Sequence, residues 1–262
     1  MIDIKSYAEN NAVKVGSLYL RPSSVADTIS HCCRMIIREN DDPSHPLWRS
    51  GSATLIKYKG KRYAAATRHE LGIDRGCDVS KQVADTVRIS SGRGILSNIP
   101  VKTCIYEMAN PDQEYHDIII FELVEYWDDM MADSPYFLEL LPFSHDKRNI
   151  SMMSGYPTIP VVMDQYHDGF YNGQIAPINI KRCVYYCDIN NGNHVNVPYF
   201  RTYNIKKNLY GVDGFSGGAM FSMIGDVGSY EIVLDGIVVR GGNGFAHIVD
   251  VDYLIVALSS SM

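Results

Sequence analysis

The feature that most constrains the fold is a long succession of short strand-like runs separated by turn residues. Such runs cover residues 32–38, 51–58, 61–67, 86–90, 101–106, 117–123, 150–153, 175–187, 199–205, 219–223 and 230–239. Helical periodicity is best sustained at the C-terminus, over residues 251–258. Because the runs are short and fall into two groups, they predict an all-β protein with two similar halves and a short C-terminal helix.

The 262 residues suffice for one large β domain or for two domains of about half that length. The strand grouping favours two. We therefore predict an N-terminal arm at 1–30, a first β-barrel at 31–126, a connection at 127–145, a second β-barrel at 146–250 and a C-terminal helix at 251–262.

The composition argues against several classes of function. The net charge is −6, and Lys/Arg clusters do not exceed pairs such as Lys206-Lys207, so we expect no nucleic-acid partner. No apolar run approaches the ~20 residues that span a bilayer, and the first residues lack the apolar core of a signal peptide. The sequence predicts a cytoplasmic protein that does not insert into membranes.

The six cysteines are expected to be reduced thiols in that compartment. Cys183 and Cys187, with His194, have a spacing that only loosely resembles a metal site, and no second pair completes four ligands. We predict neither a metal nor a cofactor.

A serine flanked by glycines, Gly214-Phe215-Ser216-Gly217-Gly218, is the first candidate for chemistry. Glycines accept backbone dihedrals that other residues resist, so such a loop can present a hydroxyl beside converging amides. The same pattern also occurs in ordinary turns that precede strands. The loop alone leaves both interpretations open.

Two further residues supply a base and an acid. His69 follows the strand-like run 61–67, and Asp117 opens the apolar run 117–123, where an ionised carboxylate is costly unless it is paired. His116 competes with Asp117, but adjacent strand residues point to opposite faces, and we favour Asp117 as the residue facing the cleft. The alternatives are a packing histidine and a turn-capping aspartate.

Five stretches carry a resemblance to a known family. They are Gly51-Ser52-Ala53-Thr54-Leu55-Ile56, Ala65-Ala66-Thr67-Arg68-His69, His116-Asp117-Ile118-Ile119-Ile120, Ser154-Gly155-Tyr156-Pro157 and the serine loop. In this order the chain resembles the trypsin-like (chymotrypsin-fold) serine proteases, in their intracellular and bacterial variety. One departure is Ala53, which stands where the family usually has a second glycine.

The resemblance implies two antiparallel six-stranded β-barrels with the catalytic groups between them. It implies that Ser216 attacks a peptide carbonyl, that His69 carries the proton and that Asp117 orients the imidazole. The amides of Gly214 and Ser216 would form the oxyanion hole. The expected partner is a protein or peptide substrate.

Departures from the family pattern concern activation and specificity. Phe215 replaces the acidic or amide residue before the serine, so activation by a cleaved N-terminus is not expected. By position, Tyr210, Val238, Val239 and Gly241 would line the substrate pocket, and the absence of an acid at its floor argues against strict Lys/Arg preference. We expect a narrow substrate range or a cleft gated by an effector partner.

Two other functions remain open. The loop also satisfies the G-x-S-x-G pattern of α/β-hydrolase esterases, with Asp235 and His247 as formal partners of Ser216, although strand–helix alternation is absent. The third is a catalytically silent protease-like domain that binds a protein through a surface enriched in its 18 tyrosines.

Overall fold

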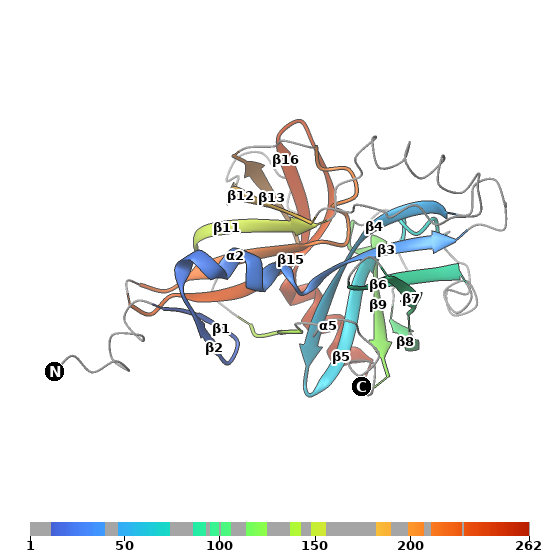
Figure 1. The fold of residues 1–262 in the computed structure, drawn as a ribbon, viewed down its shortest axis with the longest axis horizontal. Helices are drawn as coiled ribbons and strands as arrows, with labels where there is room; N and C mark the ends of the chain where they lie inside the picture. The colour runs from blue at the N-terminus through green and yellow to red at the C-terminus, as the bar shows by residue number, and fades with distance from the viewer. Residues whose placement is uncertain are drawn as a thin grey trace.

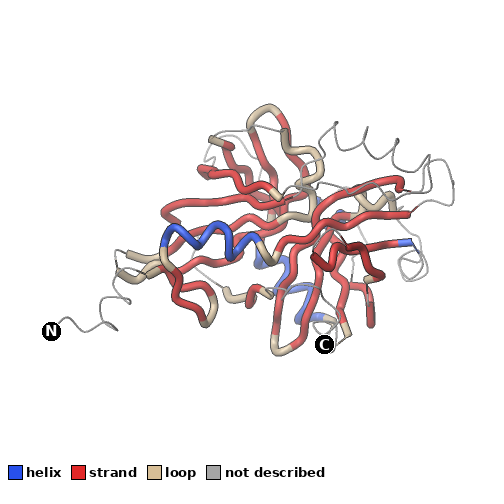
Figure 2. Tube along the Cα trace, in the orientation of Figure 1, coloured by secondary structure: helices blue, strands red, loops and turns tan. Residues whose placement is uncertain are grey.

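The structure is a computed structural model that describes residues 12–39, 47–73, 86–92, 95–99, 101–105, 114–124, 137–142, 148–155, 182–189, 199–206, 211–226 and 228–261. It confirms an all-β protein in two groups of strands with a short C-terminal helix (Figures 1 and 2). Among the described residues, no helix has the length and apolar character needed to span a membrane.

The first half is a curled, mainly antiparallel sheet. Its elements are β3 (Cys33–Glu39), β4 (Leu47–Tyr58), β5 (Lys61–Thr67), β6 (Val87–Gly92), β7 (Ile95–Asn98), β8 (Val101–Ile105), the 3-10 turn η1 (Glu114–Asp117) and β9 (Ile118–Leu123). The strand order is β7-β6-β3-β4-β5-β9-β8, which leaves the described part of this sheet open between β7 and β8. The predicted hairpin turns at Lys59 and Gly60, both with positive φ. It delivers the end of β5 beside the start of β9.

The second half is a closed barrel of six strands. These are β11 (Arg148–Gly155), β12 (Cys183–Ile189), β13 (Phe200–Ile205), β14 (Ala219–Ile224), β15 (Glu231–Gly242) and β16 (Phe245–Asp250). Closure comes from β14, which pairs with both β11 and β15. The sequence analysis missed β16, although Gly242-Asn243-Gly244 before it is a hairpin signal.

Other short elements, outside the two groups of strands, pair with one half or the other. Within residues 1–30, β1 (Val13–Val15) and β2 (Leu18–Leu20) form a hairpin, and α2 (Pro22–Ser30) follows. Strand β1 adds in parallel to β15, while β10 (Leu138–Glu139), from the expected connection, adds in parallel to β4. The domain limits given by the sequence remain predictions.

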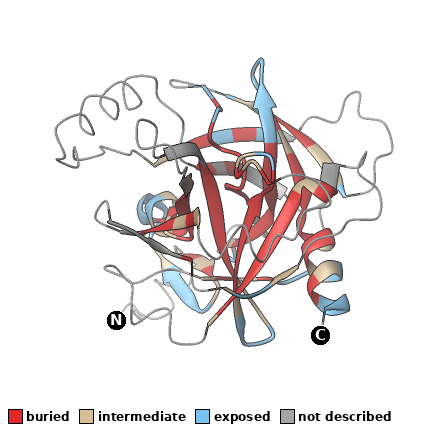
Figure 3. Ribbon diagram, turned by 90° about the vertical axis from the view of Figure 1, so that its right-hand side faces the viewer, coloured by how far each residue is buried: buried red, intermediate tan, exposed pale blue. Residues whose placement is uncertain are grey.

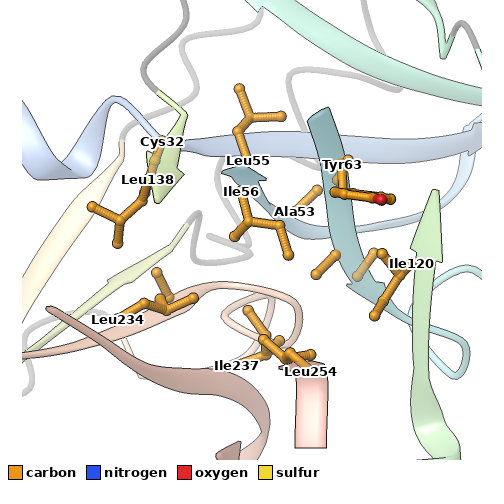
Figure 4. Close-up of a cluster of buried hydrophobic side chains, with 14 of the residues drawn as sticks. Cys32, Ala53, Leu55, Ile56, Tyr63, Ile120, Leu138, Leu234, Ile237 and Leu254 are labelled. Atoms are coloured by element: carbon orange, nitrogen blue, oxygen red, sulfur yellow. The ribbon is translucent and has the colours of Figure 1, made fainter. Parts of the chain in front are cut away.

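One apolar core runs through both halves (Figures 3 and 4). Ala53 and Ile56 of β4 belong to the same buried cluster as Leu234 and Ile237 of β15. Leu254 of the C-terminal helix α5 (Val251–Ser260) is fully buried in it. Because both groups of strands share this core, residues at the ends of strands from opposite halves are held in fixed relation.

Asp250 fixes the start of α5. Its Oδ1 accepts hydrogen bonds from the amides of Asp252 at 3.0 Å and Tyr253 at 3.4 Å. Its Oδ2 accepts from Arg201 Nε at 3.2 Å. The carboxylate therefore joins the helix cap to strand β13.

Candidate active site

The glycines of the serine loop are required by the backbones packed around it. Gly214 and Gly217 have φ of 83° and 84°. A Cβ at Gly217 would lie 1.8 Å from the carbonyl oxygen of Ser52, and one at Gly218 would lie 2.3 Å from that of Ser154. Any other residue at these two positions would displace a neighbouring strand.

Strand β4 holds the loop through two buried hydroxyls. Ser52 Oγ donates to the Gly214 carbonyl and Thr54 Oγ1 donates to the Gly217 carbonyl, each at 2.8 Å. The Ser52 amide also donates to the carbonyl of Ser216 at 2.9 Å. The first half thus holds the nucleophile loop of the second, a role that the sequence analysis did not assign to these residues.

Phe215 anchors the loop from the other side. Its side chain is fully buried and stacks on Tyr185, with ring centroids 5.1 Å apart. A Cβ at Gly155 would lie 2.6 Å from Phe215 Cδ1, so the ring occupies the space in front of that glycine. Where the family that the sequence resembles has an acidic or amide residue, this chain has an apolar ring in a small core of the second barrel.

His69 and Asp117 meet at the ends of paired strands. Thr67 of β5 lies opposite Ile118 of β9, so the residues just beyond each strand are neighbours. Asp117 Oδ1 accepts from the His69 amide at 3.0 Å, and Oδ2 contacts His69 Nδ1. The His69 side chain remains 46% exposed. His116, in contrast, is buried.

Glu70 engages the other ring nitrogen of His69. Its Oε1 lies 3.4 Å from His69 Nε2. Partial burial lowers the pKa of His69, but the hydrogen bonds and charges of Asp117 and Glu70 outweigh it and raise that pKa to about 9. The imidazole is therefore cationic at neutral pH. The sequence analysis missed Glu70, although a carboxylate directly after the candidate histidine is a candidate partner for its imidazole.

The hydroxyl of Ser216 is turned toward the second barrel. Its Oγ donates to the carbonyl oxygen of Val239 at 3.2 Å. Gly51 lies between the two halves of the site: a Cβ there would be 2.9 Å from Glu70 Cβ and 3.3 Å from the Ser216 carbonyl oxygen. The serine loop therefore lies beside the His69-Glu70 segment. The hydroxyl of Ser216 and the imidazole of His69 are nevertheless each bound to other groups.

The amides predicted for the oxyanion hole are not used within the loop. The amides of Phe215, Gly217 and Gly218 donate to backbone carbonyls. In the part of the chain that the structure describes, the amides of Gly214 and Ser216 donate to no acceptor. Positive φ at Gly214 and the hydroxyl of Ser52 hold this part of the loop.

The predicted pocket residues fall in different surroundings. Tyr210 lies outside the described residues. Val238 is buried within the second barrel, and Val239 is buried in the core that both halves share. Gly241 is exposed, and Val212 packs in front of it, since a Cβ at Gly241 would lie 2.6 Å from Val212 Cγ2.

The esterase alternative is wrong. The fold is all-β, and Asp235 is buried with Tyr203 and Ser222 as donors to its carboxylate. His247 instead pairs through Nδ1 with Thr202 Oγ1 at 2.8 Å. Of the residues with loosely metal-like spacing, Cys183 and Cys187 lie on β12, and His194 lies outside the described residues.

No protein-family model matches the sequence, and a search of curated proteins finds no match. Solved structures do match. An inactivated protease paralogue of the scabies mite, S-I1, has a TM-score of 0.52 at 10% identity over 89% of this chain and 94% of its own. The thermostable serine protease AL20 from an extremophilic microorganism gives 0.53 at 13% identity over 90% and 99%.

Protease Anisep from Arthrobacter nicotinovorans gives a TM-score of 0.52 at 13% identity over 96% of this chain and 98% of its own. At such low identity the likeness concerns the fold and not the activity. With the closed barrel, the curled sheet and the C-terminal helix, these matches identify the chain as having the two-barrel chymotrypsin fold of the trypsin-like serine proteases.

Proposed function

We propose that the chain is a serine endopeptidase that uses Ser216, His69 and Asp117. The observation that carries the proposal is the double contact of Asp117 with the amide and Nδ1 of His69, beside a glycine loop that contains Ser216. A carboxylate bound to Nδ1 leaves Nε2 as the nitrogen that can exchange a proton with a hydroxyl.

In the proposed reaction Ser216 Oγ attacks the peptide carbonyl while its proton passes to Nε2 of His69. The oxyanion is stabilised by the amides of Gly214 and Ser216. His69 then returns the proton to the leaving amine as the C–N bond breaks. Water, deprotonated by His69, hydrolyses the acyl ester and regenerates the serine.

The resting arrangement has to change before this reaction can begin. Ser216 Oγ must leave the Val239 carbonyl, and His69 must leave Glu70 and lose its proton. A peptide or effector that displaces Glu70 would favour the change at His69, because it removes a charge that holds the imidazolium. This is the form of regulation that we propose for the narrow or gated activity expected from the sequence.

A silent, protein-binding domain is the second candidate. It is favoured by the hydrogen bond from Ser216 to Val239, which takes the hydroxyl away from His69. One of the similar structures is itself an inactivated protease paralogue.

A fluorophosphonate probe distinguishes the two candidates, since it reacts only with an activated serine. We expect labelling of the wild-type chain that is lost in Ser216→Ala and His69→Ala and kept in Ser24→Ala, which changes an exposed serine on α2. No labelling of folded protein, even in Glu70→Gln and above about pH 9, would favour the binding domain.

A further inference from the structure

The turn at residues 68–73, which carries the candidate base, is attached to η1 at its first residue. The amide of Arg68 donates to the carbonyl of Asp117 at 2.7 Å. The turn then closes on itself, because the amide of Gly72 donates to the carbonyl of His69 at 3.1 Å. These bonds fix where the turn begins and how tightly it curls, and a side chain from another strand fixes where it ends.

Arg38 of strand β3 binds the end of this turn. Its Nη1 donates to the carbonyl oxygen of Leu71 at 3.1 Å and to that of Gly72 at 2.6 Å. A hydrogen bond from a charged donor is stronger than one between two neutral groups. The side chain of Leu71 is fully buried in the core that both halves share. The end of the turn is therefore held by the guanidinium and by the core.

Glu70 lies between the two attached ends of the turn. Its side chain passes close to strand β4, since a Cβ at Gly51 would lie 2.9 Å from Glu70 Cβ. Gly51 pairs with Ile36 of β3, and Arg38 follows two residues later on the same face of that strand. The turn thus folds back over β4 toward β3, where Arg38 holds it.

We propose that Arg38 is a positioning residue that keeps His69 protonated by holding Glu70 against the imidazole. Asp117 binds His69 at the start of the turn, whereas the contact of Glu70 depends on how the rest of the turn is held. Glu70 Oε1 lies 3.4 Å from His69 Nε2, compared with about 2.9 Å in a typical hydrogen bond, so a small displacement of the turn breaks this contact.

The charges that act on His69 in the described chain are those of Asp117 from η1 and Glu70 from its own turn, and both favour the imidazolium. Loss of one of them makes the imidazole a weaker base. Arg38 would thereby hold the site in its resting form. That consequence for activity rests on the proposed function, whereas the effect on the protonation of His69 does not.

The charge of Arg38 and its hydrogen bonds predict opposite effects on His69. A nearby cation disfavours an imidazolium, so removal of the charge alone would raise the pKa of His69. Removal of the bonds to Leu71 and Gly72 releases Glu70 and lowers that pKa. The sign of the change therefore distinguishes positioning by Arg38 from a direct effect of its charge.

The test follows the imidazole of His69 by NMR, which requires no catalysis. Chains with isotope-labelled histidine are titrated with base, and the His69 signal is identified by its loss in His69→Gln. We expect the pKa of His69 to fall in Arg38→Gln by about 0.5 to 1 from its wild-type value of about 9. Arg38→Lys keeps a cation without the planar fork and should give a smaller decrease.

Arg88→Gln is the matched control. The guanidinium of Arg88 also donates to a backbone carbonyl, that of Val87 at 3.4 Å, but this carbonyl belongs to its own strand β6. The control should leave the pKa of His69 unchanged. In a Glu70→Gln chain, Arg38→Gln should produce no further decrease, because Glu70 is the group through which Arg38 acts.

An unchanged or raised pKa of His69 in Arg38→Gln overturns the inference, and so does an equal decrease in the Glu70→Gln chain. The signal of His247, in the second barrel, should titrate as in the wild type and shows that each variant is folded. If Arg38→Gln does not fold, Arg38→Lys decides: a lowered pKa of His69 supports the inference and an unchanged one rejects it.

Fluorophosphonate labelling then connects the result to the proposed reaction. A pKa lowered by 0.5 to 1 should speed labelling of Arg38→Gln at neutral pH by about three- to tenfold, because more of the imidazole is neutral. A lowered pKa without labelling of any variant would reject the proposed catalysis and leave the positioning role of Arg38 intact. Labelling of the wild type with no change of pKa in Arg38→Gln would do the reverse.

Discussion

Ser216 Oγ donates its hydrogen bond to the carbonyl oxygen of Val239, 3.2 Å away. This bond takes the hydroxyl away from His69, whose Nε2 lies 3.4 Å from Glu70 Oε1. The two groups of the proposed reaction are therefore both held by other partners in this arrangement.

Glu70→Gln should change the pH dependence of fluorophosphonate labelling. Since the base must be neutral and the pKa of His69 is raised to about 9, the wild-type rate should increase with pH up to that region. Removing the Glu70 charge lowers that pKa, so the rising limb moves to lower pH. If the pKa of His69 falls by one, the rate at neutral pH should rise about tenfold.

Glu139→Gln, which loses an exposed pair with Lys57, serves as the control and should leave the profile unchanged. An identical profile in Glu70→Gln would contradict the role given to Glu70.

The pairing of His69 with Asp117 and Glu70 should also stabilise the fold while His69 is protonated in the folded chain. Its contribution to the free energy of unfolding is therefore fully present below about pH 6.5 and lost as pH rises through about 9. Urea unfolding at several pH values checks this sign.

Ser52→Ala should loosen the nucleophile loop from the first half. The change leaves the buried carbonyl of Gly214 without the Ser52 donor and should cost about 1–3 kcal/mol of unfolding free energy. Fluorophosphonate labelling of Ser216 should fall by more than the decrease in the folded fraction of the protein explains. Ser229→Ala, at an exposed turn, is the control. Unchanged labelling in a folded Ser52→Ala chain would show that the loop does not depend on β4.

Phe215→Ala should be strongly destabilising, because a fully buried ring stacked on Tyr185 is replaced by a cavity. The expected loss of unfolding free energy is about 3–5 kcal/mol. Phe215→Asp should be worse, since it buries a carboxylate among apolar side chains. The matched control is Phe245→Ala, which truncates a ring that is 36% exposed. Chemical denaturation measures both losses. If Phe215→Ala and Phe245→Ala lost similar amounts of unfolding free energy, the anchoring role of Phe215 would be refuted.

Asp250→Ala should weaken the attachment of α5. It removes the acceptor for the amides of Asp252 and Tyr253 and the ion pair with Arg201, and should cost about 1–3 kcal/mol. Asp250→Asn keeps a capping oxygen and should cost less. A double-mutant cycle with Arg201→Gln separates the ion pair from the cap, and equal losses in Asn and Ala variants would argue against capping.

Much of the strand framework could be predicted locally. The β4–β5 hairpin, the apolar strand β9 and the C-terminal helix each follow from short-range periodicity and turn residues. Strands β1 and β10 could not be found in that way. They are short and are completed by parallel pairing with β15 and β4, far away in sequence.

By itself, the sequence determined which residues were chemically suited to the site and in what order they occur. It identified the glycines around Ser216 and the His69 and Asp117 pair, because these depend on residue type and position at strand ends. Only the tertiary structure decided what each side chain contacts. Glu70 takes Nε2 of His69, Val239 takes the hydroxyl of Ser216, and Arg38 binds the turn that follows β5. These choices depend on packing between elements distant in sequence, which no local pattern records.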